Sequence, residues 1–234
     1  ADGGVELSNI WRRTAFALTF NEYNLFGSSL IEPKSQILWV RNVRDRAEKV
    51  APFLRYDADP YPAVVDGEVK WIIDAYTVSN RYPYSQSANV NQLTPGSGLN
   101  LDFNYVRNSV KVVVDAYSGE MTFYVVDPTD PIIQTWSAVF PDLLTPVSKA
   151  APEVVDHFRY PEDLFRVQTN MYGRYQFGDA ALFFNRDAAW SVAQAPPSEP
   201  DVNTVAGGVA TDLANPDLID VQEANVARFE PYYT

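Results

Sequence analysis

Residues 63–77 read Ala-Val-Val-Asp-Gly-Glu-Val-Lys-Trp-Ile-Ile-Asp-Ala-Tyr-Thr, and this stretch decides the fold. Asp66-Gly67 is a strong signal for a two-residue type I′ turn, in which both central residues need a positive φ. Every second residue from Val69 to Ala75 is apolar, which predicts a strand with one buried face. The stretch therefore predicts a β-hairpin at the centre of the fold.

A second hairpin follows the same rules further along the chain. Val110–Tyr117 and Met121–Val126 alternate in the same way on either side of Ser118-Gly119. Ile73–Tyr76 and Val114–Tyr117 share an apolar-Asp-Ala-Tyr step. This step fits two strands under one alternation rule better than a duplicated unit. Between the hairpins, Gln86–Asn104 is long for a loop, which predicts a lid or a variable insertion.

Helices are predicted before and after the two hairpins along the sequence. In Ser8–Phe20, the side chains of Trp11, Ala15 and Leu18 share one helical face. The other predicted helices are Arg41–Leu54, Asp130–Phe140 and one that begins at Pro161-Glu162-Asp163. The fold class is therefore α+β: an antiparallel sheet from two β-hairpins, packed against several helices on one face.

Composition sets the limits of the domain. The chain has 234 residues, 46% of them apolar, and a net charge of −12, which excludes a wholly disordered chain and argues against a nucleic-acid partner. Residues 195–234 hold seven acidic residues against one arginine, together with five prolines. We predict a globular α+β domain over 1–194 and an acidic, proline-bearing extended arm over 195–234, with room for a short helix.

Few kinds of catalytic site fit this sequence. There is no cysteine and only one histidine, which excludes disulfides, thiolate metal sites and histidine metal cages. Nucleotide-binding and hydrolase motifs are missing, so no catalytic residue and no cofactor is assigned. The remaining candidates are two aspartate pairs in turns, which are weak Ca²⁺ ligands or hydrolytic carboxylates and more typical of turn and capping roles. These candidates are Asp57, Asp59, Asp127 and Asp130.

Tyrosines beside prolines are the best candidates for a binding surface. A rigid aromatic face next to acids can stack on a sugar or on a side chain of a partner. The plainer interpretation is that each ring covers the core at a strand end. The candidate residues are Tyr61, Tyr82, Tyr84 and Tyr160.

A series of blocks follows one another in a familiar order along the chain. Among them are Asp59-Pro60-Tyr61-Pro62, Tyr82-Pro83-Tyr84-Ser85, Asn104-Tyr105-Val106-Arg107-Asn108-Ser109, Asp130-Pro131-Ile132-Ile133 and Arg159-Tyr160-Pro161-Glu162-Asp163. Over roughly residues 4–193, and again at 231–233, the sequence resembles the soluble region of uncharacterised protein family 0182, which consists of large bacterial membrane proteins. The resemblance implies membrane helices N-terminal to this stretch, a location outside the cytoplasm and a chain that continues past Thr234. It assigns no activity and no catalytic residue.

Together these observations favour a non-enzymatic binding or scaffolding domain of a multi-spanning cell-membrane protein. Its expected partners are the protein's own membrane helices, an envelope protein or glycan, or a second copy of the chain. Two alternatives stay open. One is a cell-envelope enzyme that uses Asp/Glu pairs on a glycan or lipid-linked substrate, and the other is a regulatory or assembly domain that dimerises through a sheet edge.

Overall fold

The computed structural model describes residues 4–28, 30–32, 34–37, 40–90, 93, 96–185 and 190–193, and it confirms an α+β fold. The predicted acidic arm, 195–234, lies outside the described residues, so the division at residue 194 stays a prediction. The elements are β1 (Val5–Glu6), α1 (Ile10–Phe20), α2 (Asn24–Gly27), β2 (Gln36–Ile37), α3 (Val43–Val50), β3 (Arg55–Tyr56), β4 (Tyr61–Val65), β5 (Glu68–Ser79), β6 (Tyr105–Asp115), β7 (Met121–Val125), α4 (Pro131–Val139), β8 (Leu144–Pro146), the short 3₁₀ helix η1 (Val147–Lys149), α5 (Pro152–Val155), α6 (Glu162–Tyr175) and α7 (Ala180–Asn185).

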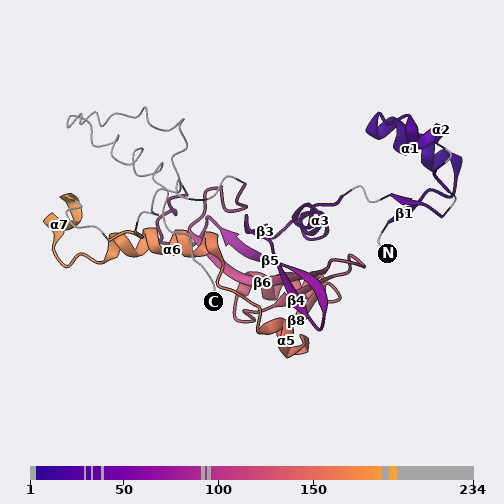
Figure 1. The fold of residues 1–234 in the computed structure, drawn as a ribbon. Helices are drawn as coiled ribbons and strands as arrows, with labels where there is room; N and C mark the ends of the chain where they lie inside the picture. The colour runs from indigo at the N-terminus through magenta and orange to yellow at the C-terminus, as the bar shows by residue number, and fades with distance from the viewer. Residues whose placement is uncertain are drawn as a thin grey trace.

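A six-stranded sheet built on β5 and β6 forms the body of the molecule (Figure 1). Its order is β3-β5-β6-β7-β8, and β4 also pairs with β5. All these pairs are antiparallel except β7 with β8, which is parallel. The parallel pair was not predicted, and it arises because α4 carries the chain back across the sheet between the two strands. The sheet is therefore mixed rather than purely antiparallel.

Both predicted hairpins are confirmed. In the first, Val65 pairs with Glu68, and Asp66 and Gly67 have φ values of 53° and 80°, as a type I′ turn requires. In the second, β6 and β7 form a ladder that ends at the pair of Val114 with Met121. The Asp66-Gly67 turn thus fits the register of the first hairpin, whereas β6 ends at Asp115 rather than at Tyr117 and is joined to β7 by a longer connection than the predicted Ser118-Gly119 turn.

The sheet is covered on both faces, whereas the sequence predicted helices on one face only. On the predicted face, Ile73 and Ala75 pack with Val112 among side chains from α3 and α4. On the other face, Ile72 belongs to a cluster with Val154 of α5, and Tyr76 to a cluster with α6. The prediction failed because the residues between the alternating apolar positions of β5 are buried as well.

The segment between β5 and β6 is part of the core rather than the expected lid. Of its described residues, Leu93, Leu99 and Phe103 are at most 9% exposed and pack with α6. Gly98 lies so close to β3 that a Cβ atom there would fall 2.5 Å from the backbone oxygen of Tyr56. Only glycine fits at this close approach.

The N-terminal unit, by which we mean the described residues from 4 to 37, stands to one side of the sheet (Figure 1). It consists of α1 and α2 with the short β1–β2 ladder. Asn9 caps the N-terminus of α1, because its side chain accepts a hydrogen bond from the backbone N–H of Trp11. None of the helices among the described residues combines the length and the apolar character needed to cross a lipid bilayer.

Candidate functional site: a tyrosine platform at one end of the sheet

The strongest candidate site lies where β5 ends and β6 begins. Ser79 pairs with Tyr105 there, and the side-chain amide of Asn104 holds the turn that follows β5. The Asn104 amide accepts a hydrogen bond from the Tyr82 N–H at 3.0 Å and donates to the Tyr82 carbonyl at 2.8 Å. These two hydrogen bonds hold the Tyr82 ring over the Tyr105 ring, with 5.8 Å between the ring centroids and an angle of 20° between the ring planes.

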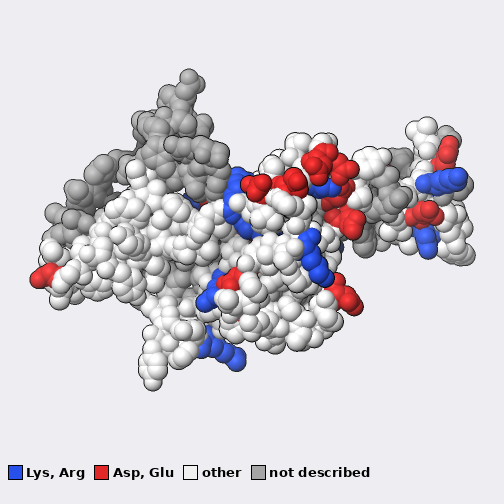
Figure 2. Space-filling view, turned by 90° about the horizontal axis from the view of Figure 1, so that it is seen from below, with Lys and Arg blue, Asp and Glu red and all other residues white. Residues whose placement is uncertain are grey.

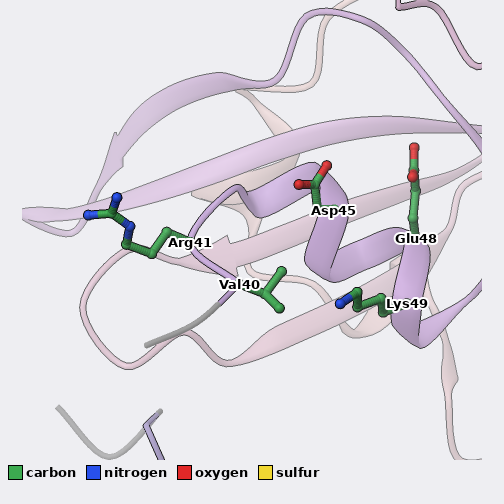
Figure 3. Close-up of a pocket in the computed structure, with 5 residues that line it drawn as sticks. All are labelled: Val40, Arg41, Asp45, Glu48 and Lys49. Carbon is green, nitrogen blue, oxygen red and sulfur yellow. The ribbon is translucent and has the colours of Figure 1, made fainter. Parts of the chain in front are cut away.

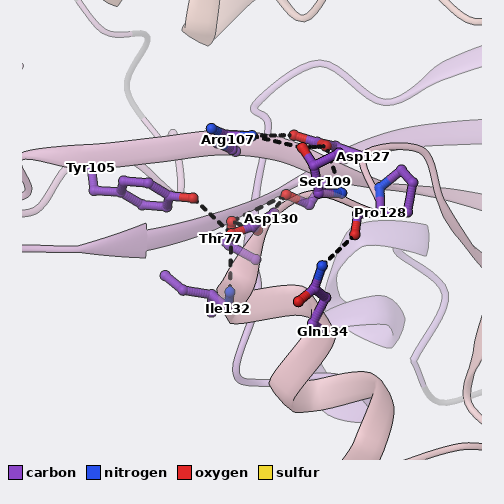
Figure 4. Close-up of polar contacts among 10 residues, drawn as sticks. Thr77, Tyr105, Arg107, Ser109, Asp127, Pro128, Asp130, Ile132 and Gln134 are labelled. Atoms are coloured by element: carbon purple, nitrogen blue, oxygen red, sulfur yellow. Dashed lines mark hydrogen bonds and ion pairs between the residues drawn. The ribbon is translucent and has the colours of Figure 1, made fainter.

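Arg107 extends this stacked pair along β6. Its guanidinium lies 5.9 Å from the centre of the Tyr105 ring and donates a 2.8 Å hydrogen bond to Asp127 (Figure 4). Tyr82 is 56% exposed, and the side chain of Arg107 is 43% exposed. We call Tyr82, Tyr105 and Arg107, with Asp127 beside them, the tyrosine platform.

Asp130 fixes the platform from below. Its carboxylate is fully buried and accepts hydrogen bonds from the Tyr105 hydroxyl at 2.7 Å and the Ser109 hydroxyl at 2.6 Å (Figure 4). The Thr77 hydroxyl and the Ile132 N–H also donate to it, so Asp130 caps α4 as well. Four donors converge on one carboxylate, which ties β5, β6 and α4 together.

The electrostatics keep the platform in one protonation state at neutral pH. Burial opposes ionisation of Asp130, but its hydrogen bonds outweigh burial and hold the pKa below its ordinary value. The hydrogen bond from Thr129, with help from Arg107, lowers the pKa of Asp127. Burial and the hydrogen bond to Asp130 raise the pKa of Tyr105 to about 12. At neutral pH the Tyr105 ring is therefore neutral and lies beside the Arg107 guanidinium.

Such a surface is suited to recognition. Tyrosine rings and an arginine give stacking, cation–π contacts and hydrogen bonds while their own positions are already fixed. These residue types are also enriched at the centres of protein interfaces.

Sequence comparison places the chain among known proteins. The model of the uncharacterised protein family UPF0182 matches residues 1–234. The chain belongs to the UPF0182 family. It is 45% identical over 192 residues to a UPF0182 protein of Moorella thermoacetica, which covers 82% of this chain and 20% of the relative. It is 44% identical over 208 residues to a UPF0182 protein of Micrococcus luteus, a match that covers 86% of this chain and 20% of the relative. It is 40% identical over 232 residues to a UPF0182 protein of Methanospirillum hungatei, a match that covers 99% of this chain and 22% of the relative.

This UPF0182 chain thus spans about a fifth of the length of the curated relatives it matches. No solved structure matches it.

The structure brings some of the predicted tyrosines together and separates others. Tyr82 and Tyr84 share the turn beside the platform, and Tyr84 is fully exposed. Tyr61 is only 8% exposed, and it pairs with Ile72, seven residues along β5 from Ser79, which is about 23 Å on an extended strand. Tyr160 is 48% exposed, and its hydroxyl binds Gln168. The four tyrosines do not form one surface.

Tyr61 has the role that the plainer interpretation gave it. Its hydroxyl donates to the His157 carbonyl at 3.0 Å and accepts from the Arg159 N–H at 3.2 Å. The Arg159 guanidinium covers the ring at 3.4 Å. Burial raises the pKa of Tyr61 to about 12, although its contacts with Arg159 oppose that rise.

Of the four aspartates proposed as weak calcium ligands, Asp57, Asp127 and Asp130 hold turns or caps, whereas the Asp59 side chain forms an ion pair with Arg159. Asp57 accepts from the Asp59 N–H at 3.0 Å, and Asp127 accepts from the Thr129 N–H at 3.0 Å. The carboxylate of Asp130 already receives four donors. Across the part of the chain that the structure describes, no group of three or more histidine or acidic side chains is placed to hold a metal ion.

The sequence did not predict a buried pair of carboxyl groups that the structure contains. Asp57 and Asp163 are each at most 2% exposed, and each accepts a 3.1 Å hydrogen bond from the backbone of the other segment, Asp57 from the Asp163 N–H and Asp163 from the Ala58 N–H. Tyr76 also donates its hydroxyl to Asp57. Burial, with the negative charge of Asp57, raises the pKa of Asp163 to about 6.

Two surface hollows of the described residues contain none of the predicted binding residues. One of about 490 Å³ is lined by Asp45, Glu48 and Lys49 of α3 with Val40 and Arg41 before it (Figure 3). Acidic side chains also gather on one face between the sheet and the N-terminal unit (Figure 2). Neither feature adds an aromatic surface, so the tyrosine platform remains the best candidate.

Proposed function

We propose that this chain is an extracytoplasmic binding or scaffolding region of a multi-spanning membrane protein, without catalytic activity of its own. The family resemblance supports the membrane context, and the small share of each relative that the chain covers leaves room for membrane segments elsewhere. The partner that we favour is an envelope protein, because the platform combines tyrosine and arginine in the manner of interface centres.

One observation carries the binding role. The Tyr105 hydroxyl is anchored on the buried Asp130 carboxylate while the neighbouring Tyr82 ring is left exposed. A surface held in place before binding loses little conformational freedom when a partner arrives.

Location can be tested with one introduced thiol, because this chain has no cysteine. In intact cells that make the full-length protein with any other cysteines replaced, Ser87→Cys, at an exposed position, should react with a membrane-impermeant maleimide. Ala75→Cys, at a fully buried position, is the control and should react only after denaturation. Labelling of Ser87→Cys only after the cells are permeabilised would contradict the proposed location.

Binding can be tested by photo-cross-linking in the same cells. A photoreactive phenylalanine in place of Tyr84, beside the platform, should give a discrete cross-linked adduct. The yield of this adduct should fall in the Tyr82→Ala and Arg107→Ala variants. Tyr117 is 82% exposed at the opposite end of β6 and serves as the matched control site. A protease-sensitive adduct supports a protein partner, whereas a protease-resistant one removed by glycan hydrolases points to a glycan. The same yield at both sites would contradict a specific surface.

The enzyme alternative has one observation in its favour, the converging carboxyls of Asp57 and Asp163. Both are buried, and Asp163 belongs to the first turn of α6, so a substrate could reach the pair only if the start of this helix moved. Hydrogen exchange at the Asp163 and Ala58 amides measures that opening, since both amides bind the pair. Exchange that requires global unfolding would exclude the pair as an active site.

The assembly alternative has less support in the sheet. Pro62 of β4 and Pro146 of β8 lie in edge strands, and proline offers no N–H for a further strand. Light scattering that shows a concentration-independent monomer would argue against dimerisation through an edge.

A further inference from the structure

The N-terminal unit has only a small interior of its own. Leu7 and Ala17 are buried, at 3% and 5% exposure, and the Leu7 N–H donates to the Ser35 carbonyl at 2.8 Å. The Arg13 side chain returns to the Leu7 carbonyl at 2.9 Å. These contacts hold α1 against the β1–β2 ladder without using its apolar stripe.

The apolar stripe of α1 faces outward. Periodicity predicts that Trp11, Ala15 and Leu18 form the buried face, yet Trp11 is 77% exposed and Leu18 is 73% exposed. Exposed apolar side chains continue after the helix, at Tyr23 and Leu30, which are 75% and 88% exposed. Exposed apolar patches of this kind are typical of surfaces that contact a partner or a membrane.

The charge of the unit separates it from the rest of the chain. From residue 4 to residue 37 three basic residues balance three acidic ones, whereas the whole chain carries −12. Acidic and basic side chains lie close together on this unit in Figure 2. The unit can therefore approach a surface that would repel the acidic body.

The size of the face argues against a second copy as its cover. The 11-residue helix α1 is about 16 Å long and about 10 Å wide, so the part of the face on α1 covers only about 160 Å², whereas a stable dimer buries roughly 800 Å² per partner. Insertion into a bilayer interface needs only a few side chains, and Trp, Tyr, Phe and Leu are the residues that favour that region.

We infer that the outward face of the N-terminal unit, centred on Trp11 and Leu18, inserts into the headgroup region of a lipid bilayer. This inference rests on the proposed function, because it needs a membrane beside the domain. It adds that the chain itself touches the lipid and that the N-terminal unit sets the orientation of the sheet body relative to the membrane.

Vesicle flotation of the 234-residue chain tests the inference. The chain should float with phosphatidylcholine vesicles, and Trp11→Ala/Leu18→Ala should lower the partition coefficient by about tenfold or more. Phosphatidylglycerol should not strengthen binding, because the unit is neutral and the body is acidic. Trp11→Phe should still bind but should lose the quenching of tryptophan fluorescence by brominated lipids.

Tyr172→Ala/Tyr175→Ala is the matched control, since these side chains are 61% and 71% exposed on α6. It should bind vesicles like the wild type, and all variants should melt at the same temperature. Three results would overturn the inference: a chain that stays unbound at every lipid concentration, equal loss of binding in the control, or Trp11 protected by self-association without lipid. None of these results affects labelling of Ser87→Cys, so failure here is distinct from failure of the proposed location.

Discussion

The ladder between β5 and β6 contains the same ion pair twice, in two environments. Lys70 lies opposite Asp115, and four residues further along β5, Asp74 lies opposite Lys111. The side chains of the second pair are 6% and 4% exposed, whereas those of the first are 20% and 18% exposed. The pairs have the same chemistry, so burial and further partners account for their differences.

The two aspartates respond in opposite directions. Burial raises the pKa of Asp74, although the charge of Lys111 opposes the rise. The hydrogen bond from Lys70, with those from the turn at Ser118, lowers the pKa of Asp115. Asp74 also accepts from the Asn108 amide at 2.7 Å, and Lys111 donates to the Arg159 carbonyl. We call Asp74–Lys111 the inner pair and Lys70–Asp115 the outer pair. Removing one member of the buried inner pair should strongly destabilise the fold, whereas the more exposed outer pair should contribute little to stability.

Breaking the inner pair should have the largest effect. Lys111→Met leaves the Asp74 carboxyl buried without its cation, and we expect the free energy of unfolding to fall by about 3–5 kcal/mol. Urea denaturation of the 234-residue chain measures this. The double variant Asp74→Leu/Lys111→Met should recover most of the loss, because apolar side chains of similar volume replace a buried pair well. A loss below about 1 kcal/mol in the single variant would contradict the comparison.

The pH dependence of stability should come next in size. The pKa of Asp163 is raised to about 6 in the folded chain, against about 3.9 for an unfolded aspartate. The folded state therefore binds this proton more tightly, and the stability it adds is complete below about pH 4 and lost as pH rises to about 6. We expect the loss to be on the order of 2–3 kcal/mol.

Asp163→Asn tests this, because the amide keeps an acceptor for the Ala58 N–H but cannot ionise. Between about pH 4.5 and 7, which lies above the ordinary pKa of aspartate, the free energy of unfolding of Asp163→Asn should depend less on pH than that of the wild type. Asp59→Asn is the control, since its side chain is 54% exposed, and it should keep the wild-type slope. An unchanged slope in Asp163→Asn would show that Asp163 is not the group responsible.

The sequence predicts the parts of the fold that depend on neighbouring residues. Asp66-Gly67 fixes the first hairpin, and the Asp130-Pro131 step fixes the start of α4. The burial of Asp74 could not be predicted in this way, since it depends on helices that follow β6 in the chain and cover the second face of β5.

The candidate site was predicted in part. Tyr82 and Tyr84 were found because they flank a proline, whereas Tyr105 and Arg107 were missed. A signal was present, because Tyr105, Arg107 and Ser109 alternate along one strand and side chains two residues apart share a face. Their convergence with Asp130 depends on the packing of α4, which no local pattern contains.

A smaller effect should follow from removing the turn role of Asp115. Its carboxylate accepts from the Tyr117 and Ser118 N–H groups, as a helix cap would. Asp115→Ala should lower the free energy of unfolding by about 1 kcal/mol, the usual value of such a cap. Asp115→Asn keeps an acceptor oxygen and should lose less, which separates the turn contact from the charge. Equal losses in the two variants would mean that the ion pair, rather than the turn, matters here.

The smallest effect should come from Lys70→Met, which breaks the outer pair but leaves Asp115 in contact with water and with its turn. Exposed ion pairs contribute about 0–1 kcal/mol, and salt screens them. We therefore expect a change within that range in urea, and a difference from the wild type that shrinks as the NaCl concentration rises. Lys111→Met measured in the same salt series should keep its full deficit, because a buried pair is poorly screened. If salt reduced both deficits alike, burial would not be what distinguishes the two pairs.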